Sequence, residues 1–198
     1  VANIVDVPAS PAPVRPQPGV IGVVGRLVDI KRFDVVIDAL AAVRHSLPHA
    51  RLVVVGDGPE RDALEARAHA AGVAEHVEFA GALDDATTRM LDFDCLAVAS
   101  TYEGLPNVAL EAMARGIPVV AVRAGDLPRI VQDGITGVLA ADASAAALAD
   151  AIARALTSPA LQASARLEGP RFVRDEYSPG RVREQLLAVY AQLVPAPK

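Results

Sequence analysis

The sequence predicts an α/β fold built on a Rossmann-like, doubly wound parallel sheet of about six strands. Short β-branched runs alternate strictly with alanine-rich segments of helical character along the chain. The strand runs, such as VIGVV and RLVVV, are continuously apolar, which is typical of strands that helices cover on both faces. Because crossovers between such strands are right-handed, neighbouring strands are expected to run parallel.

The elements follow one another in a regular order. Strands are expected at residues 20–25, 51–56, 77–81, 95–100, 118–122 and 137–140. Helices are expected at residues 33–47, 58–72, 84–91, 108–115, 143–156, 160–176 and 179–194, with a short segment at 127–134. Pro59 suits the start of a helix and Asn107 suits an N-cap. Gly116 and Pro118 should end the helix that Asn107 caps.

The chain divides into three parts. Residues 1–19 contain five prolines and no periodicity, which indicates an extended linker, and a chain that begins in a linker suggests a preceding domain. Residues 20–178 carry the Rossmann-like pattern. Residues 179–198 hold a last helix whose apolar positions have helical spacing.

Composition excludes several classes of function. The net charge of −5 argues against a nucleic-acid partner, although a few local cations would suffice for a small anion. No apolar run approaches the roughly 20 residues of a transmembrane helix, and no signal peptide is visible. The single cysteine, Cys95, lies in an expected strand and suits a buried thiol in a reducing cytosol. We therefore expect a cytoplasmic protein.

In open parallel sheets, ligands bind beyond the carboxyl ends of the strands. The loops at that edge lie at residues 25–31, 56–59, 80–84, 100–107 and 123–128. In the first of them, Arg26 and Lys31 could converge on a diphosphate at a helix entry. The alternative interpretation makes both of them ordinary surface cations.

The stretch TYEGLPNVALEAMARG carries two glutamates, Glu103 and Glu111, with seven residues between them. The amide groups near Asn107 and Val108 should open a helix at the same edge, which is suitable for an anion. The two carboxylates would then accept hydrogen bonds from the hydroxyls of a ribose or a hexose. Alternatively, Glu111 only complements the helix dipole and Glu103 is a solvated loop residue.

Four stretches together resemble the C-terminal half of the family-four retaining glycosyltransferases, which are two-domain GT-B enzymes. They are GRL…K at 25–31, VVVGDGP at 53–59, VEFAG at 77–81 and EGLPNVALEAMARGIPVVAV at 103–122. The resemblance runs from Val20 to the final helix, and NIVD at Asn3–Asp6 is similar to an element at the family's domain junction. It implies transfer of a hexose-type sugar from a UDP-, GDP- or ADP-sugar, with no metal or other cofactor required.

The resemblance also implies a role for each site residue. Arg26 and Lys31 would grip the diphosphate and stabilise the leaving group, Glu103 would lie near the sugar, and Glu111 would hold the ribose. The backbone of Leu105–Val108 would contact phosphate. The remaining contacts would come from Gly25, Gly56 and the base-binding loop with Phe79 and Gly81, which would contact the base largely through its main chain.

Some positions depart from the family's pattern. Pro106 and Arg32 stand where glycine is common, and Asp126 and Arg129 occupy a loop that often reads Gly-Gly-x-Pro-Glu. The N-terminal domain that binds a glycan, lipid or small-molecule acceptor has no counterpart in the sequence. In the family, that N-terminal domain also supplies a histidine that contacts the sugar. The four histidines of this chain are expected at the surface instead, namely His45, His49, His69 and His76. Peripheral attachment to the inner membrane face would fit some such acceptors.

Two other functions stay open at this point. The chain could be a non-catalytic nucleotide-binding or interaction module that keeps the fold without turnover. It could also be another GT-B nucleotide-sugar enzyme, such as an epimerase, although such an enzyme should carry a different residue at Glu103. The presence of Arg26, Lys31, Glu103 and Glu111 together favours the transferase.

Overall fold

The structure is a computed structural model that describes residues 4–5, 7–8 and 19–193. Most of the expected linker therefore lies outside the described residues, as do Asn3 and Asp6 of the NIVD element.

A six-stranded parallel sheet forms the centre of the molecule, as the sequence predicts. Its strands are β1 (Val20–Val24), β2 (Arg51–Val55), β3 (Val77–Gly81), β4 (Cys95–Val98), β5 (Val119–Ala121) and β6 (Gly137–Leu139). The strand order is β3-β2-β1-β4-β5-β6, and every neighbouring pair is parallel. The order reverses between β1 and β4, so the loops that follow these two strands leave the sheet side by side.

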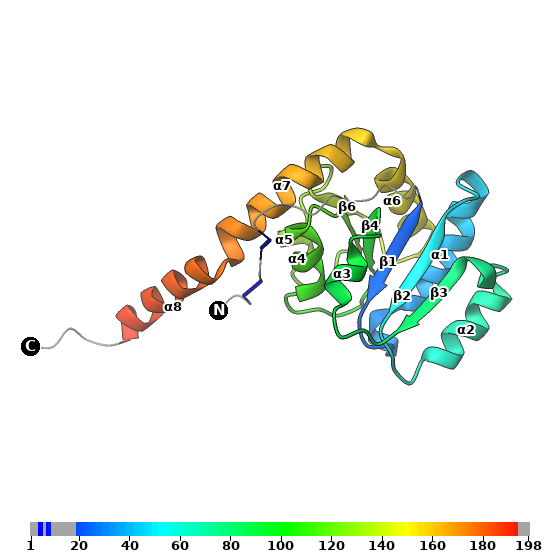
Figure 1. Cartoon of the computed structure of the whole chain (residues 1–198), viewed down its shortest axis with the longest axis horizontal. Coiled ribbons are helices and arrows are strands. Elements are labelled where there is room, and N and C mark those ends of the chain that lie inside the picture. The colour runs from blue at the N-terminus through cyan, green and yellow to red at the C-terminus, as the bar shows by residue number, and fades with distance from the viewer. Residues whose placement is uncertain (1–3, 6, 9–18, 194–198) are drawn as a thin grey trace, which may run out of the picture.

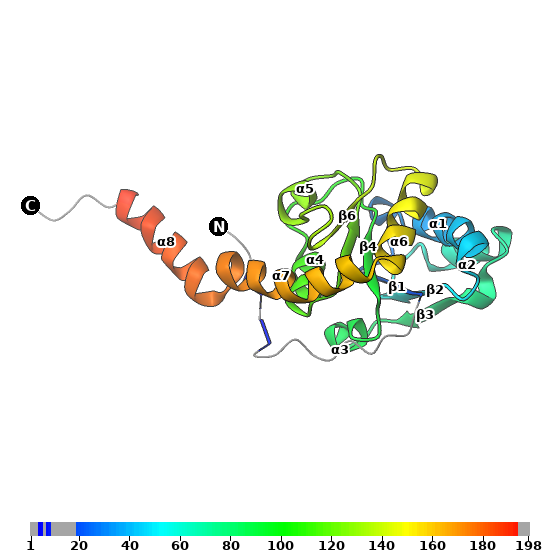
Figure 2. The ribbon, with the colours of Figure 1, turned by 90° about the horizontal axis from the view of Figure 1, so that it is seen from above.

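Helices cover both faces of the sheet, as Figures 1 and 2 show. They are α1 (Phe33–Ser46), α2 (Arg61–Ala70), α3 (Ala86–Met90), α4 (Asn107–Ala114), α5 (Leu127–Ile130), α6 (Ala145–Thr157), α7 (Pro159–Tyr177) and α8 (Pro179–Leu193), with 3₁₀ turns η1 (Asp29–Lys31) and η2 (Ala74–His76). Two apolar cores result, one under α1, α2 and α6, the other under α3, α4, α5 and the end of α7.

Alternate strand residues supply the two cores. Ile21, Leu52 and Cys95 lie in the core under α1 and α6, whereas Val53 and Leu96 lie in the core under α4 and α7. This two-sided burial is why the strand runs are continuously apolar. The edge strand β3 differs from the expectation, because most of its residues are only half-buried.

Two helix starts differ from the prediction. Asn107 is the first residue of α4 and not its N-cap, because extended Pro106 occupies the cap position and its carbonyl accepts from the N–H of Ala109 at 3.1 Å. Pro59 does not start α2, since Pro59 and Glu60 form a turn and the helix begins at Arg61. Proline lacks an N–H but keeps a carbonyl, so it can serve at the cap position as well as inside the first turn.

Helices α4 and α7 pack closely through a glycine. Gly169 is buried in α7, and a Cβ atom at this position would lie 2.7 Å from the carbonyl oxygen of Met113 in α4. The position therefore tolerates no side chain without a shift of one helix. Gly180 in α8 offers a contrast, since a Cβ atom there would meet nothing within 4 Å.

Replacing Gly169 with alanine should lower the free energy of unfolding by about 1–3 kcal/mol, because the added methyl group forces α7 away from α4. The Gly180→Ala control should leave stability unchanged or raise it slightly, as alanine favours the helix. Urea denaturation followed by circular dichroism measures both. Equal urea midpoints for Gly169→Ala and Gly180→Ala would show that α4 and α7 do not pack closely at Gly169.

Candidate functional site

Glycines bring the carboxyl ends of the first three strands together. The N–H of Gly25 donates to the carbonyl of Val55 at 2.9 Å, and the N–H of Gly56 donates to the carbonyl of Gly81 at 2.8 Å. Gly56 has a φ of +134°, and a Cβ atom on it would lie 1.9 Å from the carbonyl oxygen of Gly25. Only glycine fits such an approach. The structure thus places Gly25, Gly56 and Gly81 at one edge.

Arg26 and Lys31 both lie on the loop that follows β1. The Arg26 side chain is exposed and makes no hydrogen bond or ion pair with any residue that the structure describes. Lys31 ends the 3₁₀ turn η1 and is half-buried. The first cation is therefore available to a ligand, whereas the second already has a partner.

That partner is Glu103 of the loop after β4. Its Oε1 lies 2.5 Å from the Nζ of Lys31, and the side chains are 26% (Lys31) and 13% (Glu103) exposed. The Oγ of Ser100 donates to the same oxygen at 2.7 Å. Residues 72 positions apart in the sequence thus form one partly shielded charged group at the carboxyl edge. Lys31 and Glu103, which the sequence predicts to share one site, are thus in direct contact.

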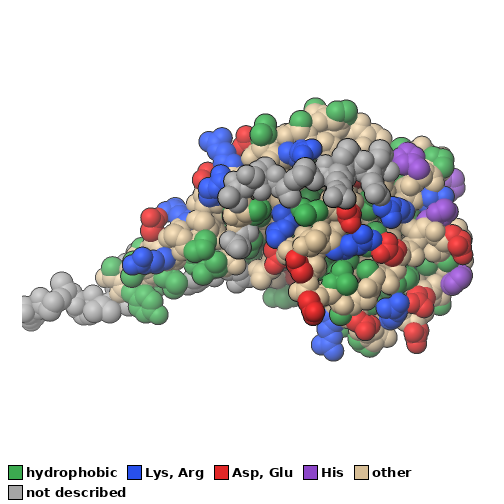
Figure 3. Space-filling model, viewed as in Figure 1, with side chains coloured by type: hydrophobic (Ala, Val, Ile, Leu, Met, Phe, Trp, Pro, Cys, Tyr) green, Lys and Arg blue, Asp and Glu red, His purple; other side chains and the backbone are tan. Residues whose placement is uncertain are grey.

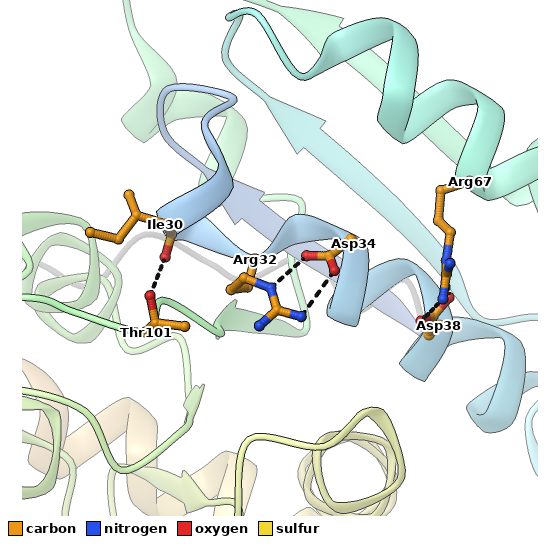
Figure 4. A network of polar contacts seen from close by, with 6 residues as sticks. All are labelled: Ile30, Arg32, Asp34, Asp38, Arg67 and Thr101. Carbon is orange, nitrogen blue, oxygen red and sulfur yellow. Dashed lines mark hydrogen bonds and ion pairs between the residues drawn. The ribbon is translucent and has the colours of Figure 1, made fainter.

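Thr101 ties the same two loops together, since its hydroxyl donates to the carbonyl of Ile30 at 3.4 Å (Figure 4). The N–H of Thr101 donates to the carbonyl of Ile30 at 3.0 Å. The next cation along, Arg32, is turned toward Asp34, to which its Nε and Nη2 donate at 3.0 and 3.1 Å (Figure 4). These hydrogen bonds raise the pKa of the Arg32 guanidinium. Arg32 is thus committed to α1, while Arg26 and Lys31 remain at the edge.

Helix α4 leads away from this edge. Its first turn begins at Asn107 and Val108, directly after Leu105 and Pro106, so the positive end of the helix dipole lies at the carboxyl side of the sheet. Glu111, one turn further along, is half-buried, and its carboxylate makes no hydrogen bond or ion pair with the described residues. An acceptor in such surroundings can take hydrogen bonds from ligand hydroxyls.

Phe79 belongs to β3, just before the loop that is expected to bind the base largely through its main chain. Its half-buried side chain packs against the core under α1 and α6, and the guanidinium of Arg61 lies over its ring at 5.6 Å from the centroid. A ligand at the end of β3 would therefore meet backbone, including that of Gly81, more readily than the ring.

A pocket of about 520 Å³ lies beside the glutamate loop. Its walls come from three separate segments, namely the loop after β4, α5 and the end of α7. They comprise Leu105, Asp126, Arg129, Ile130, Phe172, Glu176 and Tyr177. Asp126 and Arg129 are the two residues of this lining that depart from the family's pattern, and the rings of Phe172 and Tyr177 in its wall lie with centroids 5.7 Å apart.

The remaining reactive side chains lie elsewhere. His45, His49 and His69 are exposed and His76 is half-buried, and the histidines seen in Figure 3 gather at the end of the molecule opposite α8. Cys95 is fully buried, and burial raises the pKa of its thiol, so it is an inert core residue as expected. Among the described residues, no three potential ligands cluster as a metal site, and no helix is long and apolar enough to cross a bilayer.

Comparison with known proteins gives this geometry a context. The family model described as "Glycosyl transferases group 1" matches residues 10–171. A GDP-mannose-dependent alpha-(1-6)-phosphatidylinositol monomannoside mannosyltransferase from Mycobacterium tuberculosis is 38% identical over 140 residues, which cover 66% of this chain and 36% of that protein.

Two solved structures are similar in fold and sequence. HepE from Anabaena, solved in complex with UDP, is 27% identical with a TM-score of 0.81, over 87% of this chain and 48% of that one. The C-terminal domain of LpcC, a glycosyl transferase group 1 family protein from Francisella tularensis, is 28% identical with a TM-score of 0.72, over 82% of this chain and 88% of that one.

The chain spans between 36% and 48% of the length of the first curated relatives that it matches. The match to the family model nevertheless covers most of the chain, and it includes Arg26, Lys31, Glu103 and Glu111. The chain therefore belongs to the group 1 glycosyltransferase family, with a Rossmann-like α/β fold of the GT-B type.

Proposed function

We propose that this chain is the donor-binding half of a retaining glycosyltransferase. It would hold a nucleotide diphosphate hexose, which the whole enzyme transfers to a glycan, lipid or small-molecule acceptor bound by an N-terminal domain. The observation that carries the proposal is the Lys31–Glu103 pair at the carboxyl edge, between exposed Arg26 and the first turn of α4. This places cations, an acid and a helix N-terminus within one set of adjoining loops.

The cations serve the diphosphate. Arg26 offers a planar fork of donors and Lys31 a point charge, and the leading amides of α4 add a positive dipole. As the bond from sugar to phosphate breaks, negative charge grows on the departing nucleotide. Cations fixed beside it stabilise that charge more than they stabilise the intact donor, which lowers the barrier without a metal.

The acids serve the hydroxyls. Glu111, which has no protein partner among the described residues, would accept from the ribose, while Glu103 would lie near the transferred sugar. When the diphosphate takes up part of the Lys31 charge, the Glu103 carboxylate is released to accept from a sugar hydroxyl. Binding of the nucleotide sugar thus replaces one charged hydrogen bond, between Lys31 and Glu103, with two to the ligand, from Lys31 to the phosphate and from a sugar hydroxyl to Glu103.

Three observations support an acceptor-binding domain outside this chain. The stretches matched in two curated relatives cover only 36% and 48% of those proteins, and the similar LpcC structure is a C-terminal domain. Helix α8 extends away from the sheet (Figure 1), and hydrophobic side chains gather along it (Figure 3), with Leu187 and Tyr190 56% and 60% exposed. We propose that α8 packs toward that domain, since exposed apolar faces of this kind mark contacts. The phosphatidylinositol in the mannosyltransferase's name fits an enzyme at the cytoplasmic membrane face.

Removing both cations should abolish most of the nucleotide affinity. Isothermal titration with UDP and GDP should show binding to the parent chain, weakened at least about tenfold in the Arg26→Ala/Lys31→Ala variant, because each charge-assisted hydrogen bond contributes about 1.5–3 kcal/mol. The Arg174→Ala/Arg183→Ala variant loses the same charge from exposed positions of α7 and α8 and should bind as the parent does. Equal affinity in all three proteins would disprove the diphosphate site.

Glu111→Gln should weaken binding of the nucleotide through its ribose. We expect the parent to bind UDP about tenfold more tightly than 2′,3′-dideoxy-UDP, and Glu111→Gln to reduce that ratio to about twofold, since a neutral amide accepts less strongly than a carboxylate. The Glu184→Gln control, at an exposed position of α8, should keep the parent's ratio. If Glu111→Gln has the same ratio of the two affinities as the parent, Glu111 does not bind the ribose hydroxyls.

A further inference from the structure

The pocket beside the glutamate loop combines apolar and charged walls. Leu105, Ile130 and the ring of Phe172 provide apolar surface, and Tyr177 adds a second ring with a hydroxyl. At about 520 Å³ the pocket has the size of a small-molecule site. An apolar wall facing polar groups suits a pyranose, which has both C–H and hydroxyl surfaces.

The charged groups of the pocket sum to a negative charge. Asp126 and Glu176 each bring a carboxylate, against the single guanidinium of Arg129. Arg129 is bound by Asp126, since its Nη1 lies 3.1 Å from Oδ1 of that residue. Asp126, Arg129, Glu176 and Tyr177 line the same pocket, and burial raises the pKa of the Tyr177 hydroxyl.

The pocket adjoins the proposed donor site through the backbone. Leu105, which lines it, is two residues beyond Glu103. A Cβ atom on Gly125 would lie 1.7 Å from the carbonyl oxygen of Glu103, so the loop that carries Asp126 rests directly on the glutamate loop. A sugar attached to a diphosphate at Lys31 and Arg26 would have this pocket as its neighbour.

We propose that this pocket receives the donor's hexose and selects a neutral polyhydroxylated ring over a ring that carries a carboxylate, with Asp126 as the deciding residue. Hydroxyls donate to the carboxylates of Asp126 and Glu176, whereas a uronate would face both of them. The one guanidinium in the pocket lining is paired with Asp126, so a uronate would have to compete with that carboxylate for it. The inference rests on the proposed function, because the nucleotide must anchor the sugar beside the pocket.

Isothermal titration with UDP-glucose and UDP-glucuronate tests the preference for a neutral hexose over a uronate, because the two ligands differ only at C6. The GDP-mannose and GDP-mannuronate pair is used in the same way if the chain prefers guanine. We expect the parent to bind the neutral sugar about fivefold or more tightly. Asp126→Asn removes one negative charge and releases Arg129, so the ratio should fall to about one or reverse. The Asp126 side chain makes no capping hydrogen bond to α5, so the variant should keep the fold.

The matched control is Asp175→Asn, which removes a charge from exposed Asp175 of α7, outside the pocket lining, and should keep the parent's ratio. A parent that binds both sugars equally or prefers the uronate overturns the inference, as does an Asp126→Asn ratio equal to the parent's. Those results leave nucleotide binding intact and thus spare the proposed function. Failure of every nucleotide to bind would overturn both.

Discussion

The close approach of backbones at the carboxyl edge of the sheet is the constraint on which the site depends. Gly56 touches the carbonyl of Gly25, and the strand ends are tied by hydrogen bonds from one glycine to the next strand. A side chain at position 56 would push β1 and β2 apart where their loops begin. The loop after β1 could then no longer meet the loop after β4, and the pairing of Lys31 with Glu103 would be lost.

Local charge at this edge differs from the charge of the whole chain. The net charge is −5, yet exposed Arg26, half-buried Lys31 and the start of α4, each of which attracts anions, lie together at the carboxyl edge. Without a ligand, the Glu103 carboxylate balances Lys31 and keeps a partly shielded cation from lacking a partner, which would be costly. In the proposed function, a diphosphate would take over this balancing role.

The sequence was sufficient for the features that depend on local patterns. Strict alternation of apolar runs and helical segments indicates the parallel sheet, and the topology alone brings the loops of Lys31 and Glu103 together. It was insufficient to predict the start of α4, because both Pro106 and Asn107 can occupy an N-cap position, and the structure has Pro106 there. The sequence singled out Asp126 and Arg129 but not the walls around them, because Leu105, α5 and the end of α7 are brought together only by tertiary packing.

The two ends of the described domain meet near that same pocket. The N–H of Val5 donates to the carbonyl of Tyr177 at 3.2 Å, and buried Val5 lies in the core under α4 and α7. Tyr177 lines the pocket and ends α7, immediately before α8 departs. The proposed N-terminal domain would thus connect to this domain through the segment of Val5, and α8 would contact it from the end of α7. Both connections lie beside the proposed hexose pocket, so closure of that domain would complete the wall around the sugar and exclude water from the bond that breaks.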